Sequence, residues 1–218
     1  MRRGRYDRPR CVGSPAGAAV LGVGAMTVLI LGLVLFLGAH SVRVFAEPWR
    51  QRTIASAGER AWKGGYSVLS LVGLGLVVWG FGLARADPTL VWLPPIWTRH
   101  LAALLVLVAL VLLVAAYVPG NGIKARLHHP MVLGVKVWAL AHLVSNQFLH
   151  ELVLFGAFLL WAVLSFRAAR GRDRAAGTTY PAGSLAMTLL TVVLGVAAWA
   201  VFAFWAHRAL FGVAPFGR

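Results

Sequence analysis

Four of the chain's seven histidines lie between residues 125 and 151, in a run that is otherwise mostly apolar. Trp138, His142 and Asn146 follow at intervals of four, so a helix with about 100° per residue puts them on one stripe. We predict that His142 lies in the middle of this helix, with the other two a turn before and a turn after it. An ionisable side chain at the centre of a spanning helix costs about 2.5–3.5 kcal/mol, so His142 needs a partner or a function.

His40 is the second buried candidate, near the end of the first apolar run, in LVLFLGAHSVRVF. Two imidazoles on different helices that face one cavity suit the axial positions of a haem iron. A neutral imidazole ligates through one ring nitrogen and leaves the other for an orienting hydrogen bond. The alternative is structural, with each histidine bonded to a serine or a backbone carbonyl of a neighbouring helix. Spacing alone leaves both interpretations open.

Further histidines stand at the two ends of the same segment. His129 precedes Pro130, which suits the first helical position, and therefore lies on the N-cap side, where free N–H groups favour anions. The alternative role for His129 is that of an interfacial capping residue. The other polar side chains lie within reach of a membrane interface and need no special function: His128, Lys136, His150 and Glu151.

Composition places the chain in a membrane. It has 218 residues, of which 60% are hydrophobic and 12% charged, and its mean hydropathy is +0.78. Its apolar runs do not alternate as barrel strands do, so we predict an all-α fold, a polytopic helical bundle integral to the lipid bilayer. About six transmembrane helices are expected, over residues 17–45, 66–86, 99–118, 130–148, 152–166 and 185–208.

The flanking segments suggest how the chain is organised. Residues 1–15 are expected to be a disordered basic tail, and Met26 is a candidate for the true start. Residues 16–175 form the predicted membrane domain, and residues 176–218 a linker with an additional transmembrane helix. Most of the 21 basic residues lie between apolar runs, which indicates a topogenic role and no nucleic-acid partner. If the chain starts at Met26, the charge distribution favours the three basic loops in the cytoplasm.

Several motifs occur in a familiar order. The stretches FLGAHSVRV, GERAWKGGYSVLSLVGLGLVVWGFGLARA and AAYVPGNGIKARLHHPMVLGVKVWALAHLVSN resemble the NnrU family of bacterial membrane proteins over about residues 26–175. This family is associated with nitrite and nitric oxide reduction in denitrifiers. It is also similar to the plastid 15-cis-zeta-carotene isomerase, a membrane protein with haem b. The resemblance implies a location in the bacterial inner membrane, with five helices in the family core and one beyond it.

The resemblance also assigns residues. It implies haem b as cofactor, His40 and His142 as the axial pair, and His129 and Trp138 as members of the same motif. We add Asn146, which follows His142 on the predicted stripe. Where the isomerase has a cysteine three residues before the second histidine, this chain has Ala139, so ligand exchange through sulfur is not expected.

The leading hypothesis is therefore a haem b protein that acts in nitrite and nitric oxide metabolism or in redox sensing. A haem-dependent cis–trans isomerase of a polyene is the alternative, and the expected class if the protein is an enzyme. An apolar small molecule is then a candidate ligand. A non-haem membrane assembly factor is a third hypothesis. The stretch HHPMVLG also resembles a motif of isoprenylcysteine-type methyltransferases, but their acidic motif is replaced here by RAARGRDRAAG. Catalytic residues and protein partners remain open.

Overall fold

The computed structural model describes residues 15–216, and within that range all regular structure is helical. Five helices there are long and apolar enough to cross a membrane, which confirms the predicted all-α polytopic bundle. A sixth apolar helix, α6, has 16 residues and is shorter than the others. The elements are α1 (Pro15–Phe45), α2 (Glu47–Ala57), α3 (Glu59–Ala84), α4 (Trp97–Tyr117), α5 (Gly122–Leu127), α6 (Pro130–Ser145), α7 (Leu149–Ala175), α8 (Leu185–Val201), the π-helix η1 (Phe202–Ala206) and α9 (His207–Phe211).

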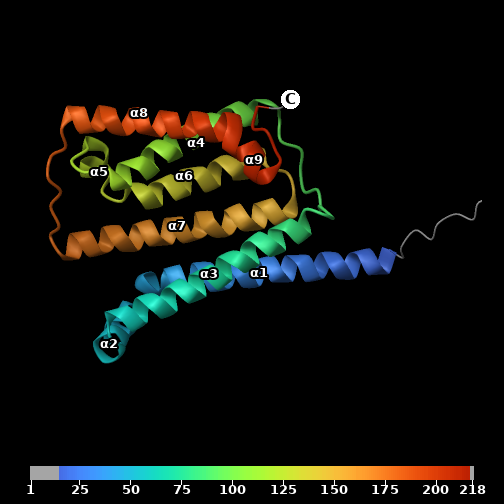
Figure 1. Ribbon diagram of the computed structural model, residues 1–218, viewed down its shortest axis with the longest axis horizontal. Helices are drawn as coiled ribbons and strands as arrows, with labels where there is room; N and C mark the ends of the chain where they lie inside the picture. The colour runs from blue at the N-terminus through green and yellow to red at the C-terminus, as the bar shows by residue number, and fades with distance from the viewer. Residues whose placement is uncertain (1–14, 217–218) are drawn as a thin grey trace, which may run out of the picture.

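The long helix α7 joins two groups of helices (Figure 1). On one side of it, α1 and α3 pack along each other; on the other side lie α6, α4 and α8, each packed on the one before it. α6 and α7 are connected by only three residues and form the hairpin that the sequence predicts. As a result, side chains of α1, α6 and α7 can meet around one space.

Glycines let α1 and α3 approach each other closely. A Cβ atom at Gly73 would lie 2.7 Å from the backbone nitrogen of Phe36, and one at Gly32 would lie 2.5 Å from the nitrogen of Val77. Both distances are shorter than van der Waals contact, so only glycine allows this backbone separation, as at close helix crossings in membranes. The interface beside them is apolar and buried, with Leu29, Leu33, Leu37 and Val77 at its centre.

The basic segments gather at one end of the bundle. α2, α5 and the end of α7 lie there together (Figure 1). Eleven lysines and arginines belong to this end, five in residues 43–63, two in 124–126 and four in 167–174. At the opposite end the described chain has Arg85, Arg99 and Arg208. Counted over the described residues alone, the positive-inside rule therefore favours the α2 and α5 end as the cytoplasmic one.

The helix boundaries differ from the prediction in three places. Residues 47–65, expected as a polar connection, form α2 and about the first two turns of α3. α7 continues to Ala175 through the charged segment, nine residues beyond the expected end. α6 ends at Ser145, because Asn146 adopts an extended conformation with φ −97° and ψ 152°. Glu151 then starts α7 by accepting hydrogen bonds from the N–H groups of Gln147 and Phe148.

Residues 1–14, where most of the basic tail is expected, lie outside the described range.

Candidate functional site

A cavity of ≈ 440 Å³ opens at the basic end of the bundle, between the end of α1, the start of α6 and the second half of α7. α7 supplies one face of it, because residues spaced four apart along a helix lie above one another. The other walls come from the last turns of α1 and the first turn of α6. The principal lining side chains are His40, Arg43, His129, Trp161, Ser165, Ala169, Arg172 and Asp173.

His40 lines this cavity with its ring held in one orientation. Its Nδ1–H donates to the carbonyl oxygen of Phe36, one turn earlier in α1, at 2.7 Å. The ring also contacts Phe36, Tyr66 and Trp161, with centroids 4.3, 5.3 and 6.1 Å away. Because a carbonyl oxygen can only accept, the Nδ1 atom carries the proton and the lone pair of a neutral ring is on Nε2. A backbone carbonyl that fixes the tautomer in this way is the usual outer partner of a metal-ligating histidine.

Two buried donors on the α7 wall have no partner. Trp161 Nε1 and Ser165 Oγ make no hydrogen bond within the described part of the chain. Ser165 is only 8% exposed. A buried donor without an acceptor costs about 1–3 kcal/mol, so natural proteins rarely leave one in this state. Since both residues line the cavity, an acceptor atom of a bound molecule would remove this cost.

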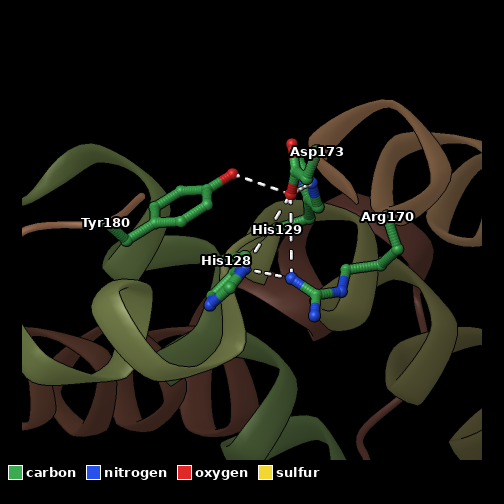
Figure 2. A network of polar contacts seen from close by, with 5 residues as sticks. All are labelled: His128, His129, Arg170, Asp173 and Tyr180. Carbon is green, nitrogen blue, oxygen red and sulfur yellow. Dashed lines mark hydrogen bonds and ion pairs between the residues drawn. The ribbon is translucent and has the colours of Figure 1, made fainter. Parts of the chain in front are cut away.

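His129 connects the cavity to a polar cluster near the end of α7 (Figure 2). His129 Nε2–H donates to Asp173 Oδ2 at 2.8 Å, and the hydroxyl of Tyr180 donates to the same oxygen at 3.0 Å. Arg170 Nη1 lies 3.7 Å from this oxygen and also contacts His128 Nδ1. The ring of His128 stacks on Tyr180 with centroids 4.0 Å apart. The Asp173 charge is therefore balanced by its own neighbours.

The Tyr180 hydroxyl is in its protonated, donating form at neutral pH. Partial burial raises the pKa of Tyr180 above its ordinary value, and the hydrogen bond to the Asp173 carboxylate raises it further. Tyr180 lies in the connection between α7 and α8, so this bond ties that connection to the end of α7.

The remaining charge at the cavity is positive. Arg43 and Arg172 both line it, and Arg172 Nη1 donates to the backbone carbonyl of Arg43 at 3.3 Å, which links α1 to α7. Within residues 15–216 neither guanidinium forms an ion pair with a carboxylate. The first turn of α6 also points its N–H groups to this end, and the His129 side chain makes no capping bond to them. The cavity thus favours an anionic group.

His142 lies elsewhere, close to the end of α6. Its ring stacks on Phe155 with centroids 4.2 Å apart and an interplanar angle of 8°, and Trp138 packs against it at 5.5 Å. Phe155 and Trp161, the α7 neighbours of His142 and His40, are six residues apart, or about 9 Å along a helix. Between the two histidines stands a row of rings in contact, Phe36, Phe158 and Trp138.

The structure therefore brings together only part of the predicted set. His40 and His129 line one cavity, whereas His142, Trp138 and Asn146 do not. The expectation of a mid-helix His142 is wrong, because α6 ends at Ser145 and His142 lies in its last turn. Asn146 does lie one turn after His142: its backbone N–H donates to the His142 carbonyl at 2.9 Å, and its side chain is a hydrogen-bond partner of the His142 ring. The backbone carbonyl of Asn146 also accepts a hydrogen bond from Trp92 Nε1, at 2.8 Å.

Sequence reasoning did not single out the α7 wall. Trp161 and Ser165 are four residues apart in the helix predicted over 152–166, and Asp173 follows eight residues later, in the charged segment beyond its expected end. A polar atom at each of these positions, on one face of an apolar helix, is a signal that could have identified the wall.

The fold and the cavity define a polytopic helical membrane protein with a polar cavity near one end. The chain belongs to the NnrU family, described as NnrU protein, which matches residues 28–215. This match extends beyond residue 175 and includes α8, whereas the motif resemblance ended near that residue. No curated protein and no solved structure matches the chain. The relation to the carotene isomerase therefore stays a prediction.

Proposed function

We propose that this NnrU-family protein binds haem b in the cavity at the ends of α1, α6 and α7, in the bacterial inner membrane. The observation that carries the proposal is the state of His40. Its Nδ1–H is bonded to Phe36, its Nε2 lone pair is free, and its ring lines the cavity. Bound haem would supply an iron that exchanges single electrons and binds nitric oxide at an open position, which suits nitrogen-oxide metabolism or redox sensing.

The types of residue around His40 suit a bound haem. His40 would be the protein ligand of the iron, and the aromatic side chains of Phe36, Tyr66 and Trp161 hold the imidazole in place. The contacts of His142 give it less support as the second ligand, because its ring packs against Phe155 and Trp138, has the Asn146 side chain as a hydrogen-bond partner, and does not line this cavity. His129 does line it, with Nε2 engaged by Asp173. We therefore propose that His40 would hold the iron, which when bound would supply a site for a small ligand such as nitric oxide.

The residues that line the cavity give less support to the isomerase alternative. A polyene is apolar along its whole length, whereas Arg43, His129, Arg172 and Asp173 all face this cavity. Enclosing a polyene among these groups would desolvate charge without pairing it. We therefore favour a redox or gas-binding role over double-bond isomerisation.

The test is the absorption spectrum of the purified protein. The full chain is expressed with a haem precursor, purified in detergent, and recorded in its oxidised and reduced states, with protein from precursor-starved cells as the control. We expect a Soret band that shifts on reduction and shifts again when nitric oxide is added. Absence of the band rejects haem binding. A Soret band that does not shift when nitric oxide is added rejects the nitrogen-oxide role but not haem binding.

A further inference from the structure

The cavity contains groups that a haem iron would not use. Trp161 Nε1 and Ser165 Oγ are buried donors without acceptors, one helical turn apart on α7. His40 offers the opposite chemistry, a lone pair without a donor, because its Nδ1 proton already bonds to Phe36. The two α7 side chains therefore need a second feature of the ligand, an atom that accepts hydrogen bonds.

The surrounding charge specifies what kind of acceptor this is. Arg43 and Arg172 line the same cavity, and neither is paired with a carboxylate in the described residues. The one acidic side chain in the lining, Asp173, is already engaged by His129 and Tyr180. The N-terminus of α6, uncapped by a side chain, faces this end as well. A neutral carbonyl would satisfy the two donors but bring no negative charge to the two guanidinium groups, whereas an acid group would serve all four.

The position of the site suits an acid attached to an apolar body. The arginines stand at the basic end of the bundle, where the interface with water is expected. Towards the middle of the bundle, the His40 ring is followed by the rings of Phe36 and Phe158. A ligand with its acid group at the arginines would have its apolar part on the aromatic side.

We infer that Trp161 and Ser165 bind a carboxylate of the cavity's ligand, with Arg43 and Arg172 as its counter-charges. The inference rests on the proposed function only in taking the cavity as a ligand site, and it does not need an iron. In a porphyrin the carboxylate is a propionate, and in a lipid acid it is the head group. The two sources share the same recognition and are separated by experiment.

Iron-free protoporphyrin IX is the probe. The full chain is purified in detergent from cells starved of haem precursor, and binding of the porphyrin is followed by its fluorescence, beside its dimethyl ester. We expect the diacid to bind at least about tenfold more tightly than the diester, because a hydrogen bond to a charged group is worth about a decade in affinity. Ser165→Ala and Trp161→Phe should each weaken the diacid about tenfold and the diester less, because a hydrogen bond to a neutral ester carbonyl is weaker than one to a carboxylate. Ser145→Ala, which removes a hydroxyl bonded to Ala141 at the far end of α6, is the matched control.

Equal affinity for diacid and diester overturns the inference, and so does diacid binding that Ser165→Ala and Trp161→Phe leave unchanged. Circular dichroism and the elution volume of each variant establish that it is folded. Displacement of the porphyrin by oleate, but not by methyl oleate, supports the carboxylate site and assigns it to a lipid acid. His40→Ala separates the two proposals, because it should abolish ligation of haem iron but retain binding of the iron-free diacid. A protein that binds the diacid and shows no Soret band with haem would reject the proposed function and support this inference.

Discussion

Replacing Gly73 by alanine is expected to disturb the candidate haem ligand from a neighbouring helix. Gly73 lies on α3, and a Cβ atom there would be 2.7 Å from the backbone nitrogen of Phe36 and 2.9 Å from its Cα. Phe36 is the residue whose carbonyl orients His40. The added methyl group therefore presses on the backbone of α1 one turn before the histidine, without touching the cavity.

The size of the effect follows from these distances. Ordinary contact begins at 3.4 Å, so α1 and α3 must separate by at least 0.7 Å at this point. Neither backbone can yield as a flexible side chain would. Overpacking of this kind costs about 1–3 kcal/mol. For a chain of this size each kcal/mol lowers the midpoint of thermal unfolding by about 2–4 °C, so we expect a fall of about 2–12 °C.

The assay is thermal unfolding of the protein in detergent, together with the haem spectrum at 20 °C as a local readout. Gly75→Ala is the matched control, because it lies on the same helix and a Cβ atom there has nothing within 4 Å. We expect Gly75→Ala to melt like the parent protein and to keep its spectrum. The reasoning is refuted if Gly73→Ala melts like the parent with an unchanged spectrum, or if the control loses as much stability.

Two further predictions concern the polar connections. Asn121→Ala should lower the free energy of unfolding by about 1–3 kcal/mol, because Asn121 is 2% exposed, caps α5 by accepting the Lys124 N–H, and donates to the Ala115 carbonyl. Asn121→Asp keeps the acceptor but places a buried carboxylate oxygen against the Ala115 carbonyl, so it should lose at least as much in a thermal melt, and a clearly smaller loss would contradict this account. Tyr180→Phe should cost about 0.5–1 kcal/mol at pH 8 by removing the donor to Asp173. Because folding raises the pKa of Tyr180, the stability difference between the parent and Tyr180→Phe should be complete below about pH 10 and disappear as the pH rises through the folded-state pKa. A stability difference that is unchanged at about pH 11.5 would refute this prediction.

Much of the fold follows from hydropathy, because every backbone group in lipid must be satisfied within a helix. The apolar runs give the number, order and approximate length of the main helices. Their ends are set by local bonds that hydropathy does not record, such as the Glu151 carboxylate that accepts the Gln147 and Phe148 N–H groups. The polar residues 47–57 form a helix although they are not apolar, and Glu47 there bonds to Gln51 and Arg50 one turn away.

The site was harder to predict, because it depends on how deep in the bundle each side chain lies. The spacing on the predicted stripe correctly placed Trp138 next to His142. The spacing within α6 could not show that His40 and His142 contact α7 at positions six residues apart. Nothing in the sequence of α1 or α6 fixes how far one helix is shifted along its axis relative to the other. His129 was identified as a cap beside the site. Its partner Asp173 is 44 residues away in the sequence, in a segment whose charges are typical of a topology signal.

The central claim is that the ligand is held at His40, and haem content per chain tests it most directly. The parent protein, His40→Ala and His142→Ala are expressed with a haem precursor, purified in detergent, and assayed for bound haem b after denaturation in alkaline pyridine. We predict about one haem per chain in the parent and in His142→Ala, and loss of most of it in His40→Ala. Full haem content in His40→Ala, or its loss in His142→Ala alone, would contradict the account.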